Sequence, residues 1–231
     1  MIPLKNLRPR THFPSVTLTL IIANFLVFLY QLSLPPRALQ TFLTTYSVIP
    51  ARVQLALAGS HFTLAQAFIP FFTSMFLHAG WLHIIGNMWF LWLFGGNVED
   101  RLGHVAYLGF YLVCGLGAGA AQTIFSLGST IPSLGASGAI AGVLGAYIIF
   151  FPSSKILTLV TLFFWWFFAR LPAVLFIGLW FLVQFLSGVS SLGSRSQGGV
   201  AWWAHVGGFL LGMLLVSGVR RKQPYDSYDY S

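Results

Sequence analysis

Among the polar side chains in the apolar stretches of this 231-residue sequence, five could perform chemistry together: His78, His83, Asn87, Ser137 and His205. A serine and a histidine together can perform acyl transfer, because the imidazole removes the hydroxyl proton as the oxygen attacks a carbonyl carbon. Further histidine and asparagine side chains can donate hydrogen bonds to the oxyanion that forms. These residue types predict hydrolysis through a serine nucleophile, if the fold brings the five positions together.

The composition excludes a water-soluble globular protein. Hydrophobic residues make up 57% of the chain and charged residues only 7%, whereas an ordinary soluble domain has about 25% charged residues. The mean hydropathy of +0.80 indicates that lipid is the main solvent. The net charge of +8 does not indicate nucleic-acid binding, because the basic residues flank apolar runs. The single cysteine, Cys114, excludes an intrachain disulfide and is expected to be a packing residue.

Six apolar segments are candidates for membrane spans. They are Val16 to Leu32, Leu82 to Gly96, Val105 to Leu127, Leu134 to Phe151, Leu171 to Leu186 and Ala201 to Val219. The prediction is an all-α membrane protein, with a six-span domain over 16–219 and short tails at 1–15 and 220–231. Two further apolar stretches, 33–81 and 157–170, are expected to lie in the membrane interface. For the second stretch, a seventh span or a longer, tilted fifth span is the alternative.

The basic residues predict the orientation of the chain. With the N-terminus in the cytoplasm, most of them fall inside, in agreement with the positive-inside rule. Those inside are Lys5, Arg8, Arg10, Arg101, Lys155, Arg170, Arg220, Arg221 and Lys222, and those outside are Arg37, Arg52 and Arg195. Both termini are then cytoplasmic, and the second, fourth and sixth spans all run from outside to inside. We expect the protein in the cell membrane, which is the inner membrane if the source is bacterial.

Helical rise places the polar residues at a similar depth. At 1.5 Å per residue from the cytoplasmic end of each span, Ser137 and His205 lie at about 22 Å, His83 at about 24 Å and Asn87 at about 18 Å. In a hydrocarbon core about 30 Å thick, this layer is roughly 8 Å below the outer face. His78 reaches that face by the same count. Polar groups from three separate spans are therefore expected in one layer.

Small residues predict that the fourth and sixth spans touch. Ala141 follows Ser137 at helical spacing, and Gly208 and Gly212 lie on the face that carries His205. Small residues four apart allow close approach of helix backbones in lipid. A hydrogen bond between Ser137 and His205 is therefore expected. Backbone N–H groups at the start of the fourth span can serve as further oxyanion donors.

The small number of acidic residues limits the catalytic mechanisms that the sequence allows. All four acidic residues lie at the cytoplasmic edge or in the tail: Glu99, Asp100, Asp226 and Asp229. This placement excludes an aspartyl protease and leaves no acid to orient His205, so a two-residue dyad is expected instead of a Ser-His-Asp triad. A metal site of His78, His83 and His205 would lack a nearby carboxylate or thiolate, and no metal or organic cofactor is expected. Taken one by one, these polar residues also fit plain packing roles or interhelical hydrogen bonds.

Three motifs, in this order, resemble the rhomboid family of intramembrane serine proteases. They are MFLHAGWLHIIGNMWFLWLFGGNVEDRLG at 75–103, SLGASGAIAG at 133–142 and WWAHVGGFLLG at 202–212. The resemblance covers nearly the whole chain and implies a six-transmembrane-helix rhomboid-like bundle. It implies Ser137 as the nucleophile and His205 as the general base. It also implies an oxyanion hole made by His83, Asn87 and the backbone N–H of Ser137.

The resemblance implies supporting roles as well. His78 is implied at the mouth of the cavity, and structural roles are implied for Glu99, Arg101, Gly208 and Gly212. At one position the sequence departs from the family. An aromatic residue often follows the serine by four residues and stacks on the base, and here that position is Ala141. Trp202 or Trp203 is the expected substitute, and without one His205 would be held less firmly.

The implied activity is that of an endopeptidase that cuts single-pass transmembrane proteins near the outer membrane face. The fifth span is implied as a lateral gate, and substrates are implied to carry helix-breaking residues, since a helix must unwind before its carbonyls can be attacked. The connection 33–81 and the segment 187–199 are expected to cover a shallow hydrated cavity. Membrane lipid is the other expected partner. The alternative is a catalytically silent rhomboid-like protein that binds transmembrane helices, whereas a transporter would usually show repeated halves.

Overall fold

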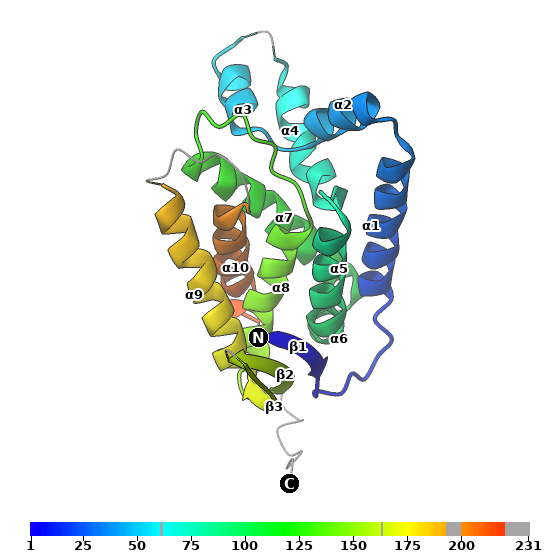
Figure 1. The fold of residues 1–231 in the computed structure, drawn as a ribbon, viewed down its shortest axis with the longest axis vertical. Helices are drawn as coiled ribbons and strands as arrows, with labels where there is room; N and C mark the ends of the chain where they lie inside the picture. Colours follow the sequence, from blue (N-terminus) through cyan, green and yellow to red (C-terminus); the bar gives the residue numbers. More distant parts are fainter. Residues whose placement is uncertain (61, 163, 193–199, 220–231) are drawn as a thin grey trace.

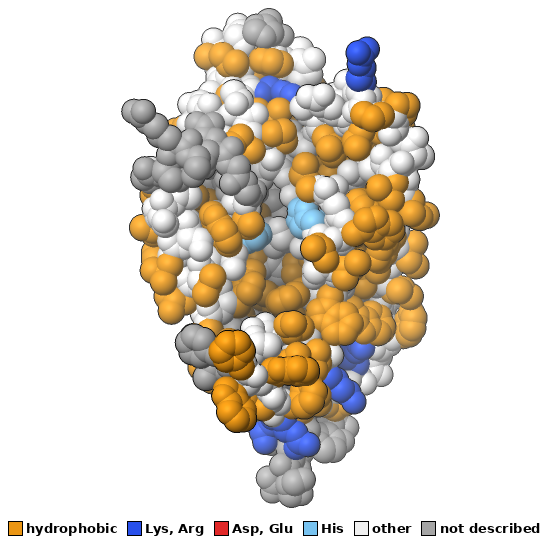
Figure 2. Space-filling view, viewed as in Figure 1, with side chains coloured by type: hydrophobic (Ala, Val, Ile, Leu, Met, Phe, Trp, Pro, Cys, Tyr) orange, Lys and Arg blue, Asp and Glu red, His pale blue; other side chains and the backbone are white. Residues whose placement is uncertain are grey.

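The computed structural model describes residues 1–60, 62–162, 164–192 and 200–219. Long helices run side by side, shorter helices cover one end of this bundle, and a small sheet lies at the opposite end (Figure 1). Hydrophobic side chains cover the middle of the molecule, and lysine and arginine side chains lie toward its two ends (Figure 2). Part of the expected cover, 193–199, and the C-terminal tail lie outside the described residues, and with them Arg195, Arg220, Arg221, Lys222, Asp226 and Asp229.

Each of the six predicted apolar segments contains a helix. These helices are α1 (Ser15–Ser33), α5 (Trp81–Phe90), α7 (His104–Phe125), α8 (Ser137–Phe150), α9 (Ala173–Ser191) and α10 (Trp202–Ser217). Within the described part of the chain, α1, α7 and α9 are long and apolar enough to cross a membrane on their own. The helices α8 and α10 have only 14 and 16 residues. The count of six spans therefore stays a prediction.

The second predicted segment is a continuous helix with a π-helical turn. From α5 the chain runs through η2 (Leu91–Gly95) into α6 (Gly96–Leu102). Before it, α4 (Leu64–Thr73) and the 3-10 helix η1 (Ser74–Phe76) meet this helix at a bend of 77°, and the bent pair is a fourth candidate span. Gly103 ends α6 with a φ of 81°, a conformation that favours glycine.

The connection 33–81 is largely helical. It contains α2 (Pro36–Tyr46), α3 (Pro50–Leu57) and α4, which lie together at one end of the bundle (Figure 1). A proline opens both α2 and α3, where its fixed φ suits a helix and its missing N–H has no intrahelical use. A capping box between Thr63 and Gln66 begins α4. The prolines and the capping box thus begin helices in the connection 33–81, where the sequence predicts an interrupted interfacial segment.

The prediction of an all-α fold is wrong at the other end of the bundle. There β1 (Ile2–Asn6), β2 (Lys155–Leu162) and β3 (Trp165–Pro172) form an antiparallel sheet in the order β1-β2-β3. The strands are rich in isoleucine, valine, threonine and aromatic residues, which favour extended backbone. The stretch 157–170 is therefore most of a β-hairpin, and it forms neither a seventh span nor an extension of the fifth.

The first strand is tied into the bundle by one asparagine. The Asn6 amide donates to the carbonyl oxygen of Leu93 and to Asn97 Oδ1, each at 2.9 Å. Its Oδ1 accepts a hydrogen bond of 2.9 Å from the Tyr147 hydroxyl of α8. The start of the chain is thus bonded to the central helix near its C-terminal end.

The central helix is α8. Every residue from Gly138 to Tyr147 is buried. A Cβ atom added at Gly208 would collide with the carbonyl oxygen of Gly138, and one added at Gly212 would collide with that of Gly142. The backbones of α8 and α10 therefore touch directly, at the glycine face that the sequence predicts.

The two residues with implied structural roles near the sheet end have specific contacts. The buried Glu99 carboxylate accepts hydrogen bonds of 2.8 Å from the N–H groups of Val16 and Thr17 at the start of α1. A carboxylate is favourable there because the helix dipole is positive at its N-terminus. Arg101 lies over the Phe150 ring of α8, 5.4 Å from its centroid. Both residues thus connect α6 to neighbouring helices.

Candidate active site

Ser137 is the first residue of α8. The first hydrogen bond of this helix runs from Ile140 N–H to Ala136 O at 3.0 Å. The N–H groups of residues 137–139 precede it and are not used by the helix itself. The Ser137 hydroxyl therefore stands beside free backbone donors at the positive end of a helix dipole.

The loop that leads to Ser137 is held by residues of the long connection 33–81. Val48 and Ser133 exchange two backbone hydrogen bonds of 3.0 and 2.8 Å, and Gly135 N–H donates to Ser74 O at 2.9 Å. Gly135 has a φ of 125°, which a side chain would strain. The connection expected to cover the site thus also fixes the approach to the serine.

His205 of α10 hydrogen-bonds to Ser137 across the glycine contact. The distance between His205 Nε2 and Ser137 Oγ is 2.7 Å, and the histidine is 7% exposed. This is the geometry of a serine hydroxyl paired with a base. The structure thus brings together the two residues that the sequence predicts as partners.

The other ring nitrogen of His205 has a partner on α9. The distance from Nδ1 to Oε1 of Gln184 is 2.7 Å. Gln184 is 7% exposed. In this arrangement a neutral amide contacts the ring nitrogen that an acid contacts in a Ser-His-Asp triad.

Two tryptophans flank the imidazole, although Ala141 provides no aromatic ring. The ring centroid of Trp180 lies 5.9 Å from that of His205 at an interplanar angle of 36°, and that of Trp202 lies 6.3 Å away at 90°. Trp203, the other expected substitute, stacks on Phe125 with centroids 4.1 Å apart. Trp202 therefore touches the base as expected, and Trp180 is an additional neighbour.

His83 and Asn87 of α5 face the turn before Ser137. A Cβ atom at Gly135 would lie 2.8 Å from His83 Nε2 and 3.6 Å from Asn87 Nδ2. The Asn87 amide nitrogen is buried and has no hydrogen-bond partner among the described residues. Two side-chain donors thus converge on the backbone of 135–137, where a developing oxyanion could accept from them.

His78 lies deeper than the sequence suggests. It is 1% exposed, and its ring packs edge-on against His83 with centroids 5.0 Å apart. Its backbone N–H and C=O both bond to the side-chain amide of Gln31 on α1, at 3.1 and 2.9 Å. Its buried ring nitrogens have no partner within the part of the chain that is described. The structure places His78 behind His83 and not at an open mouth.

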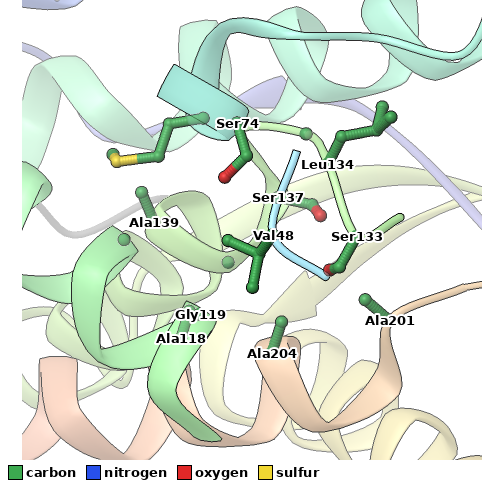
Figure 3. A pocket seen from close by; sticks show the side chains of 14 residues that line it. Val48, Ser74, Ala118, Gly119, Ser133, Leu134, Ser137, Ala139, Ala201 and Ala204 are labelled. Carbon is green, nitrogen blue, oxygen red and sulfur yellow. The ribbon is translucent and has the colours of Figure 1, made fainter. Parts of the chain in front are cut away.

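A small cavity of about 30 Å³ adjoins the Ser137 side chain. Ser74, Ser133 and Ser137 line it together with alanine and glycine residues of α7, α8 and α10 (Figure 3). A water molecule needs about 10–15 Å³ of such space. The cavity is thus large enough for water beside the candidate nucleophile.

Among the described residues, the helices that carry the site contain few charged side chains. Glu99 and Asp100 are on α6 near the sheet, and α8 and α9 contain no acidic or basic side chain. Nowhere in 1–60, 62–162, 164–192 and 200–219 do three His, Cys, Asp or Glu side chains gather as a metal site would require. The groups that the described residues bring to the site are therefore a hydroxyl, imidazoles, amides and backbone donors.

Comparison with known proteins places the chain in a family. The family model of the Rhomboid domain matches residues 65–222, which is more than half of the chain and includes all five polar positions. The chain belongs to the rhomboid family. As a rhomboid with several long apolar helices, it is a membrane protein.

Relatives of this rhomboid come from plants, yeast and bacteria. RHOMBOID-like protein 1 of Arabidopsis thaliana is 33% identical over 62% of this chain and 32% of its own length. Rhomboid protein 1, mitochondrial, of Saccharomyces cerevisiae is 33% identical over 61% of this chain and 39% of its own length. Rhomboid protease GluP of Bacillus subtilis is 41% identical over 33% of this chain and 14% of its own length. The rhomboid therefore matches well under half of each of these relatives.

Sequence reasoning missed Gln184 and Trp180 of the rhomboid site. A signal for Gln184 exists, since it is the one amide or charged side chain in the predicted span Leu171–Leu186. A polar residue inside a membrane span is a functional candidate by default. Trp180 gave no such signal, because it lies among many apolar residues of the same helix.

Proposed function

We propose that this rhomboid is an intramembrane serine endopeptidase that cuts transmembrane proteins. Ser137 acts as the nucleophile and His205 as the general base and acid. The observation that carries the proposal is the 2.7 Å contact between Ser137 Oγ and His205 Nε2, which pairs a hydroxyl with a base between two apolar helices of a membrane protein. The similarity to Rhomboid protease GluP supports the same class of activity.

Acylation of Ser137 is the first chemical step. His205 Nε2 takes the hydroxyl proton while Ser137 Oγ bonds to the carbonyl carbon of the substrate peptide. The tetrahedral intermediate carries its negative charge on the former carbonyl oxygen. It collapses as the C–N bond breaks, and the proton on His205 passes to the departing amine. The acyl group then remains as an ester on Ser137.

The oxyanion is stabilised by donors at the start of α8 and on α5. The backbone N–H of Ser137, the His83 ring and the Asn87 amide all lie around the turn 135–137. Donors that are already in place cost no reorganisation when charge develops in the transition state. The unpaired amide nitrogen of Asn87 fits this role, because a buried donor without a partner is costly in a resting protein.

Deacylation requires water in a site surrounded by lipid. The cavity beside Ser137 has room for it, and His205 removes the proton of this water as it attacks the ester. The new carboxylate product leaves, and the proton returns to Ser137 Oγ. Substrates are membrane-spanning segments that unwind near the site, since an intact helix keeps its carbonyls hydrogen-bonded.

The test compares wild type with Ser137→Ala and Ser133→Ala in liposomes that contain a single-span substrate. Ser133 is the matched control, because it lines the same cavity and the His205 contact involves Ser137 alone. Cleavage and labelling by a fluorophosphonate should be lost only in Ser137→Ala. A folded wild type that neither cleaves nor labels would favour a silent helix-binding protein. Cleavage that survives in Ser137→Ala would show that another residue is the nucleophile.

A further inference from the structure

We propose that Gln184 of α9 is a positioning residue that completes a hydrogen-bonded chain from Ser137 through His205 to Gln184. This inference rests on the proposed function and adds a third member to the predicted dyad. Two contacts of equal length carry it: 2.7 Å from Ser137 Oγ to His205 Nε2 and 2.7 Å from His205 Nδ1 to Gln184 Oε1. Each helix of the trio α8, α10 and α9 supplies one member.

The amide oxygen selects one tautomer of the imidazole. An amide oxygen only accepts hydrogen bonds, so the Nδ1 that faces it carries the proton. In a neutral ring the proton is then absent from Nε2, whose lone pair faces the Ser137 hydroxyl. Gln184 thus keeps His205 in the one neutral form that can take the serine proton. An aspartate does the same in serine protease triads, but with a negative charge.

The surroundings of Gln184 argue that it has a specific task. It is buried in a helix whose most apolar window has a mean hydropathy of 2.0. A polar side chain in such a helix is costly unless it is bonded. Trp180 lies one turn earlier on the same face, and its ring lies beside the imidazole that Gln184 holds. Trp180 therefore packs beside the His205 ring, and Gln184 bonds to its Nδ1.

The electrostatics of the site fit an amide in this place. The imidazole of His83 on α5 faces the turn before Ser137 as well. The helices packed against α10 add no acid there: α8 and α9 contain no charged residue, and α7 has only His104 at its far end. A carboxylate at position 184 would stabilise the imidazolium, so a higher pH would be needed before the ring is neutral and can act as a base. The amide orients the ring and leaves it neutral.

This arrangement makes the base depend on the position of α9. The helix packs on α10 through Phe181, whose ring stacks on Phe209 with centroids 4.4 Å apart. A hydrogen bond of 2.7 Å is lost when its partners separate by about 1 Å or more. Any movement of α9 away from α10 therefore breaks the hydrogen bond at His205 Nδ1. His205 Nε2 is then less able to take the proton of Ser137.

The experiment uses the full chain in liposomes and four proteins: wild type, Gln184→Met, Gln184→Glu and Gln122→Met. Methionine has a length similar to glutamine and no amide acceptor, whereas glutamate keeps an acceptor and adds a charge. Gln122 is the matched control, because its amide oxygen ties α7 to α10 at the N–H of Ala204 (3.1 Å). The readouts are kcat and KM, the fluorophosphonate labelling rate against pH, and the ¹⁵N shifts of His205, which report its tautomer without any substrate.

We expect Gln184→Met to lower kcat by about tenfold to a hundredfold with little change in KM, a part of the 10²–10⁴ that general-base catalysis contributes. Its His205 should lose the preference for the Nδ1–H tautomer. In Gln184→Glu the acid limb of the labelling profile should move to higher pH. Gln122→Met should keep the wild-type tautomer and pH profile, even if its Tm falls.

Three results would overturn the inference. They are an unchanged kcat and tautomer in folded Gln184→Met, an unmoved pH profile in Gln184→Glu, or equal effects in Gln122→Met. If Gln184→Met does not fold, the profile of Gln184→Glu decides. If wild type neither cleaves nor labels, the proposed function fails, and the tautomer in wild type and Gln184→Met still shows whether Gln184 sets the form of His205.

Discussion

At the scale of single residues, the proposed mechanism moves one proton between Ser137 and His205, and this transfer should set the pH dependence of the activity. His205 acts as a base only when its ring is neutral, so activity should be low in acid and rise with pH to a plateau. The ordinary pKa of a histidine is about 6.5. Measuring kcat/KM from about pH 4 to 8 tests this expectation. A rate that stays constant over this range would exclude His205 as the base.

Asn87 should matter for the transition state more than for stability. Its amide nitrogen is buried without a partner among the residues described, so replacing it breaks no bond that holds the resting fold. Asn87→Leu should lower kcat by about 10²–10³, the usual loss for one oxyanion donor. Steady-state kinetics and thermal unfolding measure the two effects. Asn24→Leu on α1 is the control and should leave kcat unchanged, because Asn24 bonds within its own helix.

Most residues around the serine could be predicted, because polar side chains in apolar helices are few. Depth and the spacing of small residues predict a contact between Ser137 and His205, and the structure places Ser137 Oγ 2.7 Å from His205 Nε2. Depth cannot tell which face of a helix looks inward, however. Gln184 is for this reason not predicted as a site residue, although it is the one amide in its span. His78 is buried although the depth count predicts the outer face, because it precedes the first residue of α5 and the helical rise does not apply to it.

At the scale of elements, glycine contacts decide how closely α8 and α10 approach. An alanine at Gly208 would press its Cβ into the carbonyl oxygen of Gly138 and force the helices apart. Gly208→Ala should destabilise the protein by about 1–3 kcal/mol, as overpacking usually does. It should also slow labelling of Ser137, because its base sits on the displaced helix. Denaturant unfolding and labelling rates measure these effects.

Gly109→Ala is the matched control for this substitution. Gly109 lies in the second turn of α7, and a Cβ there meets no described atom within 4 Å. Since alanine is the better helix former, stability should stay constant or rise slightly. Equal losses in Gly109→Ala and Gly208→Ala would contradict the close-contact explanation.

Helices were easier to predict than strands in this chain. Apolar runs mark the helical segments, because each must face lipid or the core. At 157–170 a long apolar run predicts a membrane segment instead. This run is also rich in threonine, valine and aromatic residues, which favour the strands β2 and β3. Nothing in the sequence reveals that Ile2–Asn6 supplies the third strand, because that pairing joins residues more than 140 positions apart.

At the scale of the whole molecule, the distribution of basic residues predicts that the sheet end faces the cytoplasm. Lys5 of β1 and Arg37 of α2 are both exposed and lie at opposite ends of the bundle (Figure 1). In a Cys114→Ala background, a membrane-impermeant thiol reagent added to intact cells should label Arg37→Cys and spare Lys5→Cys. After the membrane is opened, both should react. The reverse pattern in intact cells would invert the proposed orientation.

The bond between Asn6 and Tyr147 has a consequence for biosynthesis. The two residues are 141 positions apart, and ribosomes add about 5–20 residues per second. Asn6 is therefore made roughly 7 to 30 s before its partner, and β1 must wait still longer for β2. During that interval the backbone of Ile2–Asn6 has no partner strand, because β2 has not yet been made. Assembly at this end of the protein therefore joins an early segment of the chain to segments that are made much later.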